Sequence, residues 1–474
     1  MNVKTKGILS IIGASLLHIL IGSYHTWSRL MDYYISYLHY NDHPSLTLSN
    51  STSFTPFIRL IYTFFLSIGV VITSKIGIYI PCIISIIFLI ISHLILLYSV
   101  TSFFIVFAFI IYGIGIGLSY MSVILNSWSY YPKRKGIIIG IILTCFGSSS
   151  FVFKFIADFV INPEGVDVDS GTGFYDKEVS DNVVSYIKLL IVVFIIFGFF
   201  GIGIINPWNN QLIAETSTKN SMKEYRYNSN LSYYQLLDLN NEDNETIRTT
   251  VTSYFGGAEN LRVGLKSKPF FQLVIMFMLS NLFNSLHISD NVTLGKKKNK
   301  DFLSNNILIW NIANGLFRIF WGFILDTFNF KSIYLFCLFL QIMTFSTFYF
   351  IAGITPLFYL YNFLTALSNS CSSVIVPYSF YKIFGMKNGG IYFGISQFVS
   401  AISSFGIPFL IDFLSGSDID YMILFLGNSV SKMLASILLC FIEEKRYDYG
   451  MKEKENLIKS RISTSSMNSS NSNV

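Results

Sequence analysis

The sequence predicts an all-α membrane protein with twelve transmembrane helices in two bundles of six. Of its 474 residues, 52% are hydrophobic and only 13% are charged, whereas soluble domains carry about 25% charged residues. The mean hydropathy is +0.54. Apolar stretches close to the ~20 residues needed to cross a ~30 Å hydrocarbon core recur along the chain. They are continuous rather than alternating, which favours helices over a transmembrane β-barrel.

The apolar stretches divide into six spans, a polar segment and six further spans. In chain order the spans cover 7–27, 57–74, 78–98, 101–124, 136–160, 184–206, 269–288, 303–325, 332–353, 357–379, 389–412 and 420–441. The first span begins like a signal peptide, with Lys4 and Lys6 before an apolar run. No small-x-small cleavage site follows, so we expect a retained span.

The polar segment 207–268 divides the chain into domains. It separates an N-terminal bundle, 1–206, from a C-terminal bundle, 269–442, and is rich in Asn, Ser, Glu and Tyr. The Ser- and Asn-rich tail, 443–474, is predicted to be disordered. Six spans, a long linker and six spans is the layout of transporters that place their substrate near mid-membrane, between two halves.

Basic residues in short loops predict the orientation, because they accumulate on the cytosolic side. Most of them share one side of the membrane if both termini and the linker are cytosolic: Lys4, Lys6, Lys75, Lys133, Arg134, Lys135, Lys331, Lys382 and Lys387. The cluster Lys296–Lys300 opposes this orientation. Heavy use of Asn, Lys and Ile suggests an AT-rich protozoan genome, so the plasma membrane and a plastid-like organelle membrane both remain candidates.

Composition and spacing exclude several classes of function. The net charge of +6 is scattered, so no nucleic-acid footprint is expected. The five cysteines lie in apolar runs without metal-binding spacing, and we interpret them as packing residues. There is no nucleophile constellation, metal cluster or phosphate loop, so neither an enzyme nor a cofactor is predicted.

Arg318 is the residue that most needs an explanation. It lies within the apolar stretch Gly315–Asp326, eight residues before the end of span eight. At 1.5 Å per residue it sits roughly 12 Å below the interface, too deep to reach bulk water. Burying it costs about 2.5 kcal/mol or more unless it faces a wet cavity or a partner. It therefore either binds an anionic ligand, since a guanidinium grips a carboxylate through two hydrogen bonds, or pairs with an acid on another span.

Other polar residues inside spans are candidates to line the same pathway. Asn314 lies one turn before Arg318 on the same helix face. Lys154 and Asp158 lie four apart in span five, so they either pair with each other or supply a second cation and a proton carrier. His18 in span one is either a proton carrier or a hydrogen-bonded core histidine. A stripe along span seven is expected to face a polar interior: Asn281, Asn284 and His287.

Several of these segments resemble one branch of the major facilitator superfamily, the oxalate/formate antiporters and monocarboxylate porters. Gly22–Ser28 (GSYHTWS) is similar to the branch's motif in span one. The glycine-rich span four, with Gly113, Gly115 and Gly117, and the stretch Trp128 to Phe153 in span five resemble its most specific segment. Span eight matches Asn-x-x-x-Arg-x-x-x-Gly-x-x-x-Asp through Asn314, Arg318, Gly322 and Asp326.

The resemblance implies roles for named residues. The arginine of span eight binds the substrate carboxylate in that branch, and Arg318 matches it. Asp326 and Lys331 match the superfamily's cytosolic gating loop, and Lys133 and Arg134 match its loop before span five. The loop after span two lacks the family's acidic residue. Span eleven has no Lys or Arg where the oxalate exchangers carry a lysine.

These observations predict a carrier of small organic anions that works by alternating access. A single deep cation suits one carboxylate, so a monocarboxylate such as pyruvate, lactate or formate is expected, with a proton or a counter-anion as coupling partner. Two alternatives stay open. One is a carrier for another solute such as an amino acid, whose ammonium would need Asp158. The other is a non-transporting membrane sensor or scaffold that recruits partners through 207–268.

Overall fold

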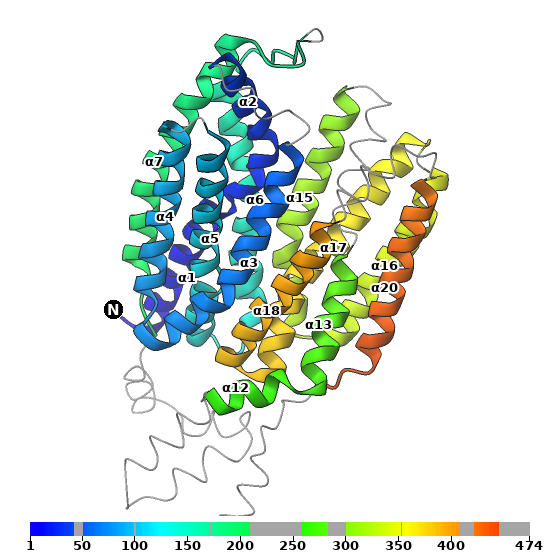
Figure 1. The fold of residues 1–474 in the computed structure, drawn as a ribbon. Helices are drawn as coiled ribbons and strands as arrows, with labels where there is room; N and C mark the ends of the chain where they lie inside the picture. Colours follow the sequence, from blue (N-terminus) through cyan, green and yellow to red (C-terminus); the bar gives the residue numbers. More distant parts are fainter. Residues whose placement is uncertain are drawn as a thin grey trace, which may run out of the picture.

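The computed structural model describes residues 1–41, 51–98, 101–169, 172–208, 258–282, 300–351, 353–406 and 421–444. These residues form a helical protein of two bundles, shown in Figure 1. The predicted fold class is confirmed, and each of the twelve predicted spans overlaps a helix in the described residues.

The N-terminal bundle contains the first six spans. Its helices are α1 (Val3–Ile21), which continues through a 3-10 turn, η1 (Gly22–Thr26), into α2 (Trp27–Tyr40), then α3 (Ser51–Ile76), α4 (Tyr79–Tyr98), α5 (Ser102–Tyr130), α6 (Lys135–Ile161) and α7 (Lys177–Ile204). The Asn2 side chain caps α1 by accepting a hydrogen bond from Thr5 N at 2.8 Å. The helical segment that contains span one therefore extends from Val3 to Tyr40, well beyond the predicted end of the span at residue 27.

The C-terminal bundle contains the remaining six spans and one short helix. Its helices are α12 (Ala258–Leu265), α13 (Lys268–Asn281), α15 (Lys300–Leu325), α16 (Phe330–Ile351), α17 (Thr355–Phe384), α18 (Met386–Phe405) and α20 (Tyr421–Cys440). Helix α12 falls within the segment predicted as linker and is held by a hydrogen bond from Tyr392 Oη to Leu261 O, 2.9 Å long. The first 49 residues after Trp208, 209–257, lie outside the described residues.

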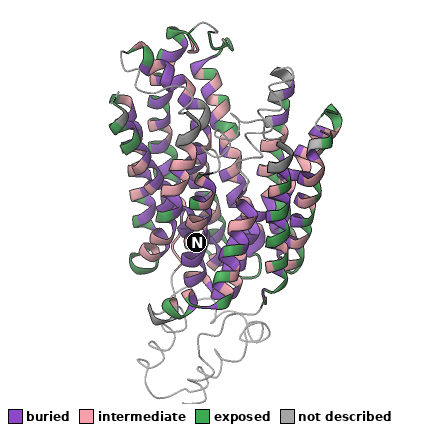
Figure 2. Ribbon diagram, turned by 45° about the vertical axis from the view of Figure 1, so that its right-hand side comes forward, coloured by how far each residue is buried: buried purple, intermediate pink, exposed green. Residues whose placement is uncertain are grey.

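Apolar side chains cover the outer surface, as expected for helices in contact with lipid. Within the described residues, eight helical segments are long and apolar enough to cross a membrane. Large exposed apolar residues lie on the bundle exterior, for example Phe155, Phe200, Phe323 and Phe339, and Figure 2 shows buried residues concentrated between the helices. Helices α17 and α18 are less apolar because they bury serines in the interior, including Ser368, Ser372, Ser396 and Ser400.

The two bundles touch mainly through two helix pairs, α6 with α15 and α3 with α18, and to a smaller extent through α6 with α17 and α5 with α18. Ser67 Oγ donates to Ile391 O at 2.8 Å across the second pair, and Thr144 Oγ1 donates to Gly315 O at 3.0 Å across the first. The first helix starts and α20 ends at the same side of the molecule, the lower side in Figure 1. The cytosolic identity of that side remains a prediction.

Candidate functional site

Glycines bring α6 and α15 into backbone contact at the centre of the molecule. A Cβ added at Gly140 would lie 2.6 Å from Arg318 O, and one at Gly322 would lie 2.3 Å from Gly136 O. Separations this short leave no room for a methyl group, so only glycine permits the approach. Gly136 and Gly140 therefore lie at the contact between the two bundles, whereas Gly113, Gly115 and Gly117 pack within the first bundle.

Arg318 reaches from α15 across this junction into the N-terminal bundle. Its side chain is 6% exposed. Nη1 donates to Leu143 O at 2.6 Å, and Nε donates to Asn314 O at 3.0 Å. Gly147 makes room for the guanidinium, because a Cβ there would lie 2.9 Å from its Cζ. A guanidinium has five N–H donors, so the two hydrogen bonds leave three donors available.

The Arg318 side chain borders a cluster of aromatic residues that we call the aromatic chamber. Its members come from α1, η1, α3, α5 and α6 and are His18, Tyr24, His25, Tyr62, Tyr120 and Phe146. Ring centroids are 5.0 Å apart for Tyr120 and Phe146, 5.1 Å for His25 and Phe146, and 5.3 Å for Tyr24 and Tyr62. Arg318 interacts electrostatically with Tyr120, Tyr24 and Tyr62. Arg318 thus lies near tyrosines, and among the described residues it has no acid as an ion-pair partner.

Within the described residues, Arg318 forms no ion pair. Backbone carbonyls carry partial charge and do not neutralise a cation. Of the two explanations for a deep arginine, the structure therefore gives no support to pairing with an acid on a neighbouring span. It leaves a buried positive charge at the junction of the two bundles.

Two of the predicted site residues, His18 and Asn314, have buried polar atoms without a hydrogen-bond partner near Arg318. His18 is fully buried, and its Nδ1 donates to Ala14 O at 2.9 Å. Its Nε2 has no hydrogen-bond partner, and neither does Oδ1 of Asn314. His18 also interacts electrostatically with Arg318. Because an unpaired buried polar atom costs about 1–3 kcal/mol, these atoms are suited to meet a polar guest or water.

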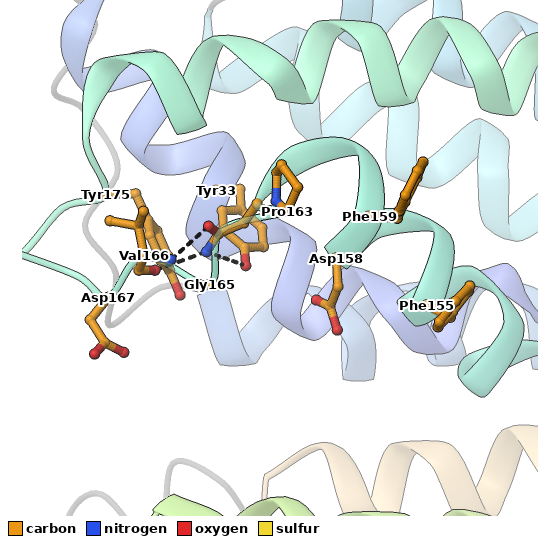
Figure 3. A pocket seen from close by; sticks show the side chains of 10 residues that line it. Tyr33, Phe155, Asp158, Phe159, Pro163, Gly165, Val166, Asp167 and Tyr175 are labelled. Atoms are coloured by element: carbon orange, nitrogen blue, oxygen red, sulfur yellow. Dashed lines mark hydrogen bonds between the residues drawn. The ribbon is translucent and has the colours of Figure 1, made fainter.

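Lys154 and Asp158 lie further along α6, away from the Arg318 guanidinium. Lys154 is two turns beyond Gly147 and Asp158 three turns beyond it, so roughly 10 Å and 16 Å along the helix. Asp158 lines a cavity of 370 Å³ with Tyr33, Asn162, Asp167 and Tyr175. Figure 3 shows the carboxylates of Asp158 and Asp167 pointing the same way. The structure does not place Lys154 and Asp158 against the guanidinium, and their proposed roles remain predictions.

The predicted stripe on span seven is described only in part. Asn281 is buried, and its Nδ2 donates to Phe277 O at 3.0 Å and to Ser280 Oγ at 3.3 Å. It therefore packs within the C-terminal bundle. Asn284 and His287 lie outside the described residues, as does most of the Lys296–Lys300 cluster.

Asp326 joins the two bundles at the end of α15. Its carboxylate accepts hydrogen bonds from Gly136 N at 2.7 Å and Ile137 N at 3.0 Å, which are amides of the first turn of α6. Such amides have no partner within their own helix. Half burial raises the pKa of Asp326, while these hydrogen bonds and the charge of Arg134 act in the opposite direction. Asp326 thus serves as the cap of a helix in the other bundle.

The other predicted gating residues have different surroundings. Lys133 and Arg134 are exposed in the loop before α6. Lys331 Nζ donates to Cys440 O at 2.6 Å and to Ile442 O at 3.2 Å, contacts that lie within the C-terminal bundle. Between the bundles, Lys135 donates instead to Tyr381 Oη and lies 3.8 Å from the centre of its ring. This contact was not predicted, because its partner is distant in sequence.

Removing the Asp326 carboxylate is expected to loosen this junction. Asp326→Ala leaves the Gly136 and Ile137 amides without acceptors, a loss of about 1–2 kcal/mol. Asp326→Asn keeps one acceptor oxygen and removes a charge that burial disfavours, so its effect should be smaller. Distances between spin labels on α6 and α15 would report the separation of the bundles. Asp181→Asn, an exposed change on α7, is the control, and equal distances in all four proteins would contradict the prediction.

Two cationic side chains that are at least partly buried inside predicted spans were not singled out in the sequence, so the expectation of a single deep cation is wrong. Lys432 on α20 is fully buried and donates to Ser280 O. Arg59 on α3 is half-buried and interacts electrostatically with Tyr24, His25 and Tyr120. Helix α3 begins at Ser51, six residues before the predicted span, which places Arg59 eight residues inside the helix. A search for every Lys and Arg within a span would have found both.

Comparison with known proteins agrees with this architecture. The family model of the Major Facilitator Superfamily matches residues 270–469. Among solved structures, the proton:xylose symporter XylE has a TM-score of 0.69 at 13% identity and covers 94% of this chain and 98% of its own. The transporter FucP in its outward conformation has a TM-score of 0.64 at 10% identity, with 92% and 99% covered. Likeness at these identities establishes the fold.

One curated relative matches a shorter region. Apicoplast pyruvate carrier 1 of Toxoplasma gondii is 25% identical over 199 residues, which cover 34% of this chain and 36% of the relative. The chain therefore aligns with about a third of the relative's length. Taken together, the C-terminal part of the chain matches the family model of the Major Facilitator Superfamily, the described chain has the fold of XylE and FucP, and eight of its described helical segments are long and apolar enough to cross a membrane.

Proposed function

We propose that this protein is a membrane transporter of small organic anions, with monocarboxylates of the pyruvate, lactate and formate type as first candidates. The observation that carries the proposal is the Arg318 guanidinium, which is 6% exposed, forms no ion pair in the described residues and lies between the two bundles. A carboxylate can accept two parallel hydrogen bonds from the three donors that remain. It would also supply the missing negative charge.

The aromatic chamber favours a small organic anion over a strongly hydrated inorganic one. Phe146 and the ring faces of Tyr62 and Tyr120 present apolar surface beside the cation. They suit the methyl group or the short chain of the guest, while tyrosine hydroxyls can donate to a second oxygen. The low local dielectric strengthens the attraction between the carboxylate and the arginine.

Alternating access fits the contacts between the bundles. Glycine contacts and a few hydrogen bonds join α6 to α15, and Arg318 lies at this junction. A guest at Arg318 would touch both bundles, so its binding energy can favour one relative arrangement of them over the other. Proton coupling through His18 or Asp158, or exchange for a counter-anion, belongs to this proposal.

The weak likeness to a pyruvate carrier supports the same substrate class. It is consistent with a plastid-like organelle membrane, and the plasma membrane is the other candidate. In either membrane we propose that both termini face the cytosol, because the basic loop residues favour that side.

Uptake into liposomes tests the proposal. Purified protein is reconstituted, and uptake of radiolabelled pyruvate, lactate and formate is measured with and without a pH gradient. Saturable uptake that unlabelled monocarboxylates suppress, and that neutral sugars leave unchanged, is the expected result. Uptake of sugars or of amino acids without any uptake of the three anions would refute the proposed substrate class.

A further inference from the structure

Arg59 places a second positive charge beside the aromatic chamber, from the opposite bundle to Arg318. It lies on α3 one turn before Tyr62 and Thr63. Thr63 Oγ1 donates to the Arg59 carbonyl at 2.9 Å, so this turn of α3 is regular and Tyr62 follows Arg59 on the same face. The Tyr62 ring stands 5.3 Å from Tyr24 and 6.4 Å from Tyr120.

The two arginines interact electrostatically with the same three side chains. Arg59 interacts electrostatically with Tyr24, His25 and Tyr120, and so does Arg318. Three members of the chamber therefore lie within the influence of a guanidinium from each bundle. Neither arginine forms an ion pair within the described ranges.

Charge balance in this region calls for more than one negative charge. An anion with a single carboxylate neutralises Arg318 and leaves Arg59 half-buried without a counter-charge. Two cations of like sign around one chamber also repel each other, and the repulsion is greatest where water is excluded. An anion with two charged ends relieves both arginines at once, with the tyrosine hydroxyls between them as further donors.

We infer that Arg59 is a second anion-binding residue, and that the chamber takes a small dicarboxylate with one carboxylate on Arg318 and the other on Arg59. The inference builds on the proposed function of Arg318 and widens its substrate class. A dicarboxylate held in this way connects α3 of the first bundle to α15 of the second. A monocarboxylate still binds, at Arg318 alone.

A comparison of three-carbon anions tests the inference. Uptake of labelled pyruvate into liposomes is inhibited with unlabelled pyruvate or malonate, and succinate and glutarate are added to vary the distance between the carboxylates. Arg59→Gln should raise the half-inhibitory concentration of the preferred dicarboxylate at least 10-fold and that of pyruvate less than 3-fold. Arg59→Lys, which keeps the charge, should restore part of the dicarboxylate affinity.

Matched variants separate this inference from the proposed function. Arg318→Gln should weaken every anion, whereas Lys188→Gln removes an exposed positive charge on α7 and should change nothing. If wild type transports pyruvate and Arg59→Gln affects pyruvate and the dicarboxylates equally, or affects neither, the inference is refuted and the role of Arg318 stands. If wild-type uptake of pyruvate is not inhibited by any dicarboxylate, the inference also fails. Thermal unfolding of each purified variant confirms that it is folded.

Discussion

Arg318→Ala is expected to reduce pyruvate uptake at least about 100-fold. Two charge-assisted hydrogen bonds to the carboxylate contribute about 3 kcal/mol or more, and each 1.4 kcal/mol corresponds to a factor of ten in affinity. The arginine's own hydrogen bonds go to the carbonyls of Leu143 and Asn314, which lie within helices. Removing the side chain therefore leaves no buried charge unpaired, and the folded protein should persist.

Two further measurements make this result specific. Arg318→Lys keeps the charge but cannot form the planar two-point contact, so it should recover only a small part of the uptake. Lys188→Ala, on the exposed face of α7, should transport like wild type. Saturable uptake by Arg318→Ala at the wild-type rate and half-saturating concentration would remove Arg318 from the binding site.

Gly140→Ala is expected to reduce transport by a factor of about 10 to 100, although Gly140 is not one of the residues proposed to bind the anion. The added Cβ would lie 2.6 Å from Arg318 O and 3.1 Å from Ile319 Cα. Backbone atoms cannot move aside as a flexible side chain can, so α15 must shift relative to α6. The shift displaces the Arg318 guanidinium from its place beside Gly147 and weakens the junction between the bundles.

Gly203→Ala is the matched control, because a Cβ at Gly203 on α7 meets no atom within 4 Å. Alanine is favoured over glycine inside a helix by up to about 1 kcal/mol, so this variant should be as stable as wild type or more so. Uptake and unfolding temperature of the two variants would be compared side by side. If Gly140→Ala transports as Gly203→Ala does, close packing of α6 and α15 is not needed for function.

Much of the architecture could be predicted because a membrane restricts what a chain can do. Backbone groups in hydrocarbon must be hydrogen-bonded within their own segment, so an apolar run of suitable length becomes a helix. The limits of the spans were less predictable. Span two was expected to begin at residue 57, two residues before Arg59, but α3 begins at Ser51, which places Arg59 eight residues inside the helix.

The sequence also identified Arg318 as the residue to explain, since a guanidinium eight residues from the end of a span has a calculable cost. What surrounds that guanidinium depends on packing between segments far apart in the chain. Leu143, Gly147 and Tyr120 belong to the other bundle, and no spacing along the sequence brings them to Arg318.

The length of the apolar runs therefore determined where the helices lie and that one of them holds a deep cation, because those properties depend on residues close together in the chain and on a hydrocarbon solvent that offers no hydrogen bonds. The tertiary structure alone decided that Arg318 has carbonyls and tyrosines rather than an acid beside it, that Asp326 caps α6, and that Arg59 shares its chamber. These facts depend on which helix faces cross between the bundles, and close contact of glycine backbones sets that crossing.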